Sequence, residues 1–161
     1  MNIEFKEITN DNVIEICQLS VFENQSHFVA PNSISLAEAY ASRNENIFAA
    51  PFGIYDSDTL IGFIMIGYDA LDDPEEPEIA KGNYLLWRLM LDKRFQGKGY
   101  AKPVLDKTLQ YIKTFPAGKA EYVWLSYEKE NTHAKEIYSR FGFEENGEFC
   151  GNETVAVYKL I

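Results

Sequence analysis

Long hydrophobic runs are missing from this sequence of 161 residues. No apolar stretch approaches the roughly 20 residues that a membrane-spanning helix needs. The first residues, from Met1 to Glu7, also lack the basic-then-apolar order of a secretory signal. Both observations argue against a membrane or secreted protein, and we expect a cytoplasmic one.

Cysteine and histidine are scarce, with two residues of each. Cys17 and Cys150 have neither metal-ligand nor redox spacing, so we expect two reduced, packed thiols. His27 and His133 are too far apart, and too isolated from other ligand types, to form a metal site. The sequence therefore predicts no metal centre.

Basic residues are in the minority, at 15 against 25 acidic residues, and the formal net charge is −10. A surface of this sign repels nucleic acid and anionic membranes and attracts polycations. Hydrophobic residues make up 46% of the chain and aromatic residues 14%, so disorder is excluded. We expect one domain spanning residues 1–161, with a small-molecule partner, no nucleic acid and no membrane.

The most informative segment joins a strand-like stretch to a helical one. Residues 84–91 are apolar and aromatic, and apolar residues recur at helical spacing from Val104 to Ile112. Between them runs Arg-Phe-Gln-Gly-Lys-Gly-Tyr-Ala, residues 94–101. A strand that breaks at such a turn and continues into a helix directs backbone N–H groups, and the positive end of the helix dipole, at one spot. That arrangement binds phosphate.

The composition of this turn supports the same interpretation. Gly97 and Gly99 let a ligand approach the main chain without a Cβ in the way, and Arg94, Lys98 and Lys102 add positive charge. The spacing is neither that of a Walker loop nor Gly-x-Gly-x-x-Gly, because Lys102 stands where the third glycine would be. Taken alone, the segment is also compatible with a simple surface turn.

A second segment near the C-terminus changes that balance. Residues 131–143 read Asn-Thr-His-Ala-Lys-Glu-Ile-Tyr-Ser-Arg-Phe-Gly-Phe. With the turn, this segment resembles the GNAT superfamily of acetyl-coenzyme A-dependent N-acetyltransferases. Arg94-x-x-Gly97-x-Gly99 is similar to that family's pyrophosphate signature, and Asn131-x-x-Ala134-x-x-x-Tyr138 opens its second one. The resemblance covers roughly Phe48 to the end, and residues 87–99 and 125–128 are most similar to the bacterial spermine/spermidine branch.

The order of predicted elements agrees with this resemblance. Strands are expected over residues 3–8, 48–55, 60–68, 84–91, 120–127, 144–149 and 154–160. A first helix is expected over residues 13–22, capped by Asn10 or Asp11, and a second over residues 35–43, starting at a capping box of Ser35 and Glu38. A third helix is expected to follow the glycine turn and run up to Pro116, and a fourth to span residues 131–141. The fold class is α/β (α+β): a mixed, mostly antiparallel central sheet of about seven strands, flanked by about four helices.

The resemblance also implies roles for named residues. Leu89 and Leu91 would offer backbone groups to the pantetheine arm, Asn131 would contact the same arm, and Tyr138 would protonate the departing thiolate. The implied cofactor-binding set is Leu89, Leu91, Arg94, Gln96, Gly97, Lys98, Gly99, Tyr100, Ala101, Asn131 and Ala134.

The general base and the acceptor site are less defined. Some polyamine acetyltransferases carry a glutamate on the strand before the phosphate turn, but Trp87 and Arg88 stand at the corresponding positions. Glu128 is the first substitute and Glu23 the second, with a water relay as the alternative. The candidate acceptor-binding residues are Glu23, Gln25, Phe28 and Asn32.

The expected activity is therefore N-acetyl transfer from acetyl-coenzyme A to a primary amine, with spermidine or spermine as the first candidate acceptor. An amino acid, an aminoglycoside-like compound or a peptide N-terminus is the alternative within the same class. A non-catalytic sensor of acyl-coenzyme A is the alternative outside it. By analogy with the family, the C-terminal strands, with Tyr158, Leu160 and Ile161, could pair or pack across a homodimer interface.

Overall fold

A computed structural model describes residues Met1 to Ile161 and contains one seven-stranded sheet in the order β1-β2-β3-β4-β5-β7-β6. The strands are β1 (Ile3–Glu7), β2 (Ala49–Asp56), β3 (Thr59–Tyr68), β4 (Tyr84–Leu91), β5 (Tyr122–Tyr127), β6 (Glu144–Cys150) and β7 (Glu153–Lys159). The helices are α1 (Val13–Gln18), α2 (Asn32–Asn44), α3 (Ala101–Ile112) and α4 (Thr132–Phe141), with short 3-10 turns η1 (Glu23–Gln25) and η2 (Glu78–Ala80). The predicted fold class is confirmed.

All neighbouring strands pair antiparallel except β4 and β5, which run parallel. The β2–β3 hairpin turns where predicted, with Ser57 in the left-handed region at φ 56°. A parallel pair needs a long crossover, and α3 supplies it between β4 and β5. The chain therefore enters α3 from the end of β4, through residues 92–100.

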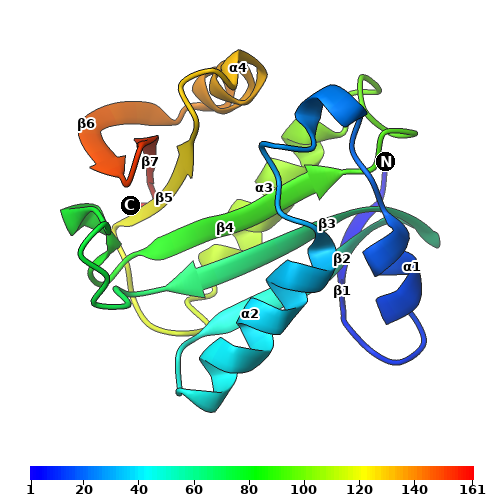
Figure 1. The fold of residues 1–161 in the computed structure, drawn as a ribbon, viewed down its shortest axis with the longest axis horizontal. Coiled ribbons are helices and arrows are strands. Elements are labelled where there is room, and N and C mark those ends of the chain that lie inside the picture. Colours follow the sequence, from blue (N-terminus) through cyan, green and yellow to red (C-terminus); the bar gives the residue numbers. More distant parts are fainter.

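The helices lie on both faces of the sheet (Figure 1). On one face α1 and α2 cover Phe63, Met65 and Met90 through residues such as Ile16 and Ala39. On the other face α3 and α4 cover a larger core. That core includes Ile64, Ile66, Leu86, Val104, Leu105, Leu109 and Leu125. No helix in the structure has the length and apolarity needed to cross a membrane.

The first helix is shorter than expected. We expected helix over residues 13–22, but α1 ends at Gln18 because Leu19 adopts an extended backbone with ψ 140°. The next residue, Ser20, donates its N–H to the Asp92 carboxylate and accepts the Lys93 N–H with its carbonyl, just after the end of β4, and a helix could not make these bonds. The predicted cap of α1, Asn10 or Asp11, is also wrong. Asn12 is the N-cap, and its side chain accepts a hydrogen bond from the Thr9 N–H instead of from a backbone N–H of the helix.

The second helix is longer than expected. It begins at Asn32, directly after Pro31, so the predicted capping box at Ser35 and Glu38 is wrong and both residues lie inside the helix. Ser35 is fully buried, and Glu38 reaches across to Arg88 on β4. The cysteines also differ in part from expectation, since both are free but Cys17 is exposed rather than packed.

Candidate active site

Strands β4 and β5 are paired only at their beginnings. Tyr84 opposes Val123 and Leu85 opposes Trp124, and no further pairs follow. From Leu86 onward the strands diverge, as Figure 1 shows, and the sheet opens into two halves. The facing edge of β4 is thereby left without a strand partner over most of its length.

The backbone of β4 shows which residues face this gap. Asp92 donates its N–H to the Ile61 carbonyl on β3, 2.9 Å away. Because backbone groups alternate sides along a strand, Leu89 and Leu91 direct theirs toward the gap. The Leu91 carbonyl accepts from the Gln96 side chain at 3.0 Å. An extended polar ligand could therefore pair with Leu89 as a further strand would.

The turn predicted to bind phosphate follows the gap directly. Gly97 and Gly99 have φ of 71° and 82°, which glycine adopts without strain. None of the backbone N–H groups from Gln96 to Lys102 donates a hydrogen bond within the chain, and the first bond of α3 runs from Val104 to Tyr100. Pro103, in the first turn of α3, has no N–H to satisfy. Unpaired donors at a helix N-terminus, here called the cradle, are an arrangement that suits an anion.

Positive charge surrounds the cradle. The Arg94 guanidinium and the Lys98 ammonium lie 5.4 and 5.6 Å from the Phe95 ring, which holds both by cation–π contact. Lys102 pairs with Asp106 at 2.7 Å. The Tyr100 hydroxyl donates to Asp56 at 2.7 Å and ties the start of α3 to the β2–β3 hairpin.

The side chain of Asp92 anchors the turn through hydrogen bonds. Its carboxylate is buried and accepts from the Ser20 N–H at 3.0 Å, the Arg94 N–H at 3.0 Å and the Arg94 Nε at 2.7 Å. Burial raises the pKa of Asp92, but these hydrogen bonds outweigh it and the net pKa is lowered. Asp92 is therefore an ionised anchor that joins the α1–η1 segment to the turn.

The candidate acceptor residue Gln25 also lies at this turn. Its amide exchanges two hydrogen bonds with the Gln96 amide, at 2.9 and 3.0 Å. Of the other candidates, Asn32 is buried and donates to the Ile16 carbonyl at 2.9 Å. Phe28 is half-buried against His27, with ring centroids 3.9 Å apart. The carboxylate of Glu23 is exposed and has no hydrogen-bond partner.

Helix α4 carries the second motif. Asn131 is its N-cap, and its Oδ1 accepts from the Ala134 N–H at 3.2 Å, which leaves Nδ2 available. Gly142 ends the helix at φ 117°. This capping fixes the helix start beside the end of β5, where Glu128 is half-buried and accepts the Asn131 N–H through its carbonyl. The Glu128 side chain has no partner.

Tyr138 occupies the middle of this aromatic region. Its ring is stacked on Tyr127 with centroids 6.3 Å apart and meets Phe143 edge-on at 5.7 Å. Burial raises its pKa to about 12, and its hydroxyl has no hydrogen-bond partner in the chain. A phenol in this state remains protonated at physiological pH and has its proton available for donation.

The sequence profile of the acetyltransferase (GNAT) family matches residues 10–143. This chain belongs to that family. It is an acetyltransferase.

Relatives of known activity support the assignment. The chain is 35% identical over 162 residues to the spermine/spermidine N(1)-acetyltransferase of Bacillus subtilis (strain 168), covering 99% of this chain and 100% of that protein. The same figures hold for a probable spermine N(1)-acetyltransferase of Bacillus subtilis subsp. natto.

Solved acetyltransferase structures share the fold. The spermidine N-acetyltransferase of Vibrio cholerae, in complex with coenzyme A and spermine, matches at TM-score 0.67 and 18% identity over 99% of this chain and 96% of that one. The aminoglycoside acetyltransferase AAC(6')-Ib, with ribostamycin and coenzyme A, matches at TM-score 0.76 and 16% identity over 99% and 94%.

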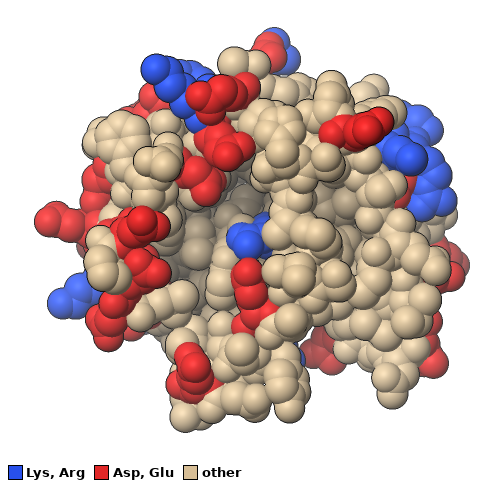
Figure 2. Space-filling view, viewed as in Figure 1, with Lys and Arg blue, Asp and Glu red and all other residues tan.

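Sequence reasoning missed one pair of charged residues on the face of β4 that α2 covers. Arg88 on β4 and Glu38 on α2 meet at 3.3 Å, from segments far apart in the chain. Figure 2 shows a hollow in this face with a basic group beside acidic atoms at its centre. Only the tertiary fold brings this pair together, and no local signal in the sequence announces it.

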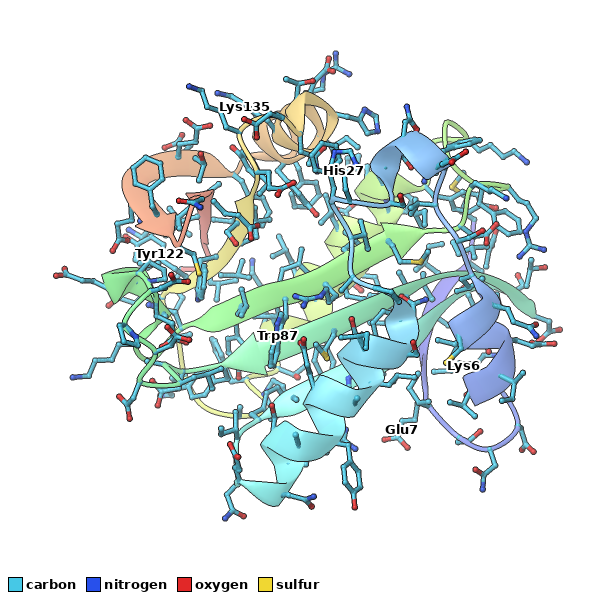
Figure 3. All side chains as sticks on the ribbon, viewed as in Figure 1. Lys6, Glu7, His27, Trp87, Tyr122 and Lys135 are labelled. Atoms are coloured by element: carbon cyan, nitrogen blue, oxygen red, sulfur yellow. The ribbon has the colours of Figure 1, made fainter.

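A second missed network lies next to Tyr138. The Tyr127 hydroxyl donates to Glu145 at 2.9 Å, and Lys135 of the acetyltransferase helix α4, labelled in Figure 3, pairs with the same carboxylate at 3.0 Å. Burial raises the pKa of Tyr127 to about 12, with the Glu145 hydrogen bond adding to the effect. This network holds the face on which the Tyr138 ring rests.

A further hollow, of about 780 Å³, lies at the opposite end of the sheet. Its lining comes from the start of β2, the end of β3 and the ends of α2 and α3, and includes Arg43, Phe48, Pro51, Asp69 and Tyr111. None of the predicted site residues belongs to it. The predicted site residues lie instead around the gap, the turn and α4.

Replacing the anchor should destabilise the protein and make it less sensitive to acid. In Asp92→Asn the charge is lost and only one side-chain oxygen remains to accept from Ser20 or Arg94, so we expect the free energy of unfolding to fall by about 1.5–3 kcal/mol at pH 7, as measured by urea unfolding. Because the folded pKa is lowered, the stabilisation by Asp92 is present above the unfolded value, about 3.9, and disappears as pH falls further. The difference between variant and wild type should shrink there.

Asp106→Asn is the matched control, because its carboxylate also accepts from a basic residue but lies on the exposed face of α3. We expect it to change stability by less than about 0.5 kcal/mol. An equal effect of the two substitutions at neutral pH would contradict the anchoring role of Asp92.

Proposed function

We propose that this acetyltransferase transfers the acetyl group of acetyl-coenzyme A to a primary amine of a polyamine such as spermidine or spermine, by direct attack in a ternary complex. The observation that carries the proposal is the 35% identity, over 99% of the chain, to a curated spermine/spermidine acetyltransferase. The net charge of −10 supports it, since an acidic surface attracts a polycation.

The site has the parts that the cofactor requires. The unpaired amides from Gln96 to Lys102 and the cations of Arg94 and Lys98 fit a pyrophosphate. Leu89 faces the gap with its backbone and would pair with the pantetheine arm, while the remaining Asn131 amide group would contact it from α4. When bound there, the cofactor supplies an acetyl thioester.

The protein's contribution is alignment and proton management. Alignment of two bound reactants is worth up to roughly 7–11 kcal/mol. An amine with a pKa near 10 must lose a proton before it attacks, which costs about 4 kcal/mol at pH 7. Glu128 or Glu23 would accept that proton directly or through water. Tyr138 would donate its phenolic proton to the departing thiolate.

The proposal extends to a cytoplasmic enzyme that works as a homodimer and needs no metal. Strand β7 cannot pair with a second copy, because it lies between β5 and β6, and Leu160 is buried. The proposed dimer contact is therefore the outer sheet edge, where β6 carries the exposed Phe149 and Ile161 is also exposed. An unpaired edge strand with an exposed aromatic side chain is a natural site for pairing with a second copy.

A panel of acceptor amines tests the acceptor class. Thiol release from acetyl-coenzyme A should occur with spermidine and spermine and should weaken as salt rises, because the attraction is between opposite charges. Amino acids and aminoglycosides should give little turnover. Turnover confined to one of those classes would reject the polyamine, and cofactor binding without turnover of any amine would favour an acyl-coenzyme A sensor.

Substitution of a turn glycine tests the cradle. Gly97→Ala should weaken acetyl-coenzyme A binding about tenfold, or about 1.4 kcal/mol, because a Cβ at φ 71° forces the amides out of alignment. Gly147→Ala is the matched control, since Gly147 also has positive φ with open space around it but lies in β6. Calorimetric binding of both variants should separate them; equal affinities would place the cofactor elsewhere.

Removal of one hydroxyl tests the proton donor. Tyr138→Phe should lower kcat roughly 10²-fold while cofactor affinity stays close to wild type, because the ring packing is kept and only the proton is lost. Tyr40→Phe, at an exposed position on α2, should leave kcat unchanged. An undiminished rate in Tyr138→Phe would remove this residue as the acid.

A further inference from the structure

The β3–β4 pairing contains a bulge at Trp87. Leu86 opposes Ile66 and Arg88 opposes Met65, so Trp87 is an extra residue with no partner. A bulge re-aims side chains and places neighbouring residues on one face. Trp87 is partly buried and packs against the core cluster that α2 covers, on the face seen in Figure 3. Arg88 points to the same side, where it meets Glu38 of α2.

The Arg88–Glu38 pair lies close to the gap between β4 and β5. Arg88 directly precedes Leu89, whose backbone faces the gap, so the two lie about 3.3 Å apart along the strand. A pantetheine arm paired with Leu89 would fill the gap, and an acceptor amine would then approach from the hollow on the α2 face (Figure 2). The Arg88–Glu38 pair lies where that acceptor would enter.

The pair is poorly made for a permanent salt bridge. Arginine can offer five donors and bind a carboxylate through two of them. Here Arg88 gives Glu38 one bond of 3.3 Å and gives another to the carbonyl of its own neighbour Trp87 at 3.0 Å. Its Nε is buried without a partner, which costs about 1–3 kcal/mol. Both side chains keep partial exposure, at 25% and 38%. The fold loses little if Arg88 leaves Glu38.

The charges around the pair set the consequence for a cationic acceptor. An ammonium group near Glu38 would be attracted by the carboxylate and repelled by the guanidinium, so the intact pair offers it almost no net attraction. If Arg88 moves to solvent, the ammonium replaces it at the carboxylate and the local charge balance is restored. An exchange of cations is therefore the arrangement that the geometry favours.

We propose that Glu38 binds an ammonium group of the acceptor and that Arg88 is the resident cation which this group displaces. The inference rests on the proposed polyamine acetylation and deepens it. The ammonium bound is not the reacting one, because an ionised carboxylate in contact raises an amine's pKa and opposes the deprotonation that attack requires. Glu38 thus selects acceptors that carry a second positive charge. The strength of the Arg88–Glu38 interaction sets how tightly such an acceptor must bind in order to displace Arg88.

Kinetics on charge-matched acceptors test the exchange. In Arg88→Met the stem length is kept and the competing charge is removed, so KM for spermidine should fall about threefold to tenfold. In Glu38→Gln, which is nearly isosteric, KM for spermidine should rise about tenfold. Butylamine, which carries a single amine, gains nothing from either change, and its KM should move less than twofold.

Controls separate this role from a structural one. Arg140→Met removes an exposed arginine whose partner, Glu136, lies on the same helix α4, and should change neither KM. Combined with Glu38→Gln, the Arg88→Met substitution should no longer lower KM for spermidine, because its benefit depends on the freed carboxylate. Thermal unfolding and acetyl-coenzyme A affinity are measured for every variant.

Each result decides between the inference and its premise. A wild type that acetylates no polyamine overturns the proposed function. A wild type that acetylates spermidine, with Arg88→Met raising KM or leaving it unchanged, overturns the exchange alone. Equal shifts for spermidine and butylamine would assign the pair to the shape of the pocket and reject charge selection.

Discussion

Strands β4 and β5 share only two residue pairs before they separate, and the site depends on the gap that follows. Unpaired backbone groups buried away from water carry a large free-energy cost, so an open strand edge in the middle of a sheet needs a polar, extended partner. The pantetheine arm in our proposal is such a partner. The same separation directs β4 toward the glycine turn and β5 toward α4, so that both motifs flank one opening.

The turn after β4 is locally positive, although the molecule as a whole is negatively charged. The protein carries a net charge of −10, yet the turn after β4 presents unpaired amides and two cations on the Phe95 ring. Asp92 stabilises this local excess from beneath by accepting hydrogen bonds from Arg94 and Ser20. An anionic cofactor and a cationic acceptor can therefore be attracted by different surfaces of one small enzyme.

Much of the fold was predictable because its signals are local. The strand at residues 84–91, the glycine turn and the helix with Tyr138 follow from apolar periodicity and turn residues, and the structure confirms them within a few residues. The early end of α1 could not be predicted this way, since Ser20 leaves the helix to bond with Asp92 and Lys93. The capping box at Ser35 also failed, because α2 begins at Asn32, so Ser35 is buried inside the helix and Glu38 contacts Arg88.

The sequence by itself determined the succession of strands and helices along the chain, the glycine turn and the Asn131–Tyr138 segment, because each depends on residues close together in the chain. The tertiary structure alone decided that β4 and β5 separate, that Trp87 forms a bulge, and that Arg88 meets Glu38. These features depend on the register between strands and on the packing of a helix across a sheet. Both are set by the whole core, which no local pattern of residues records.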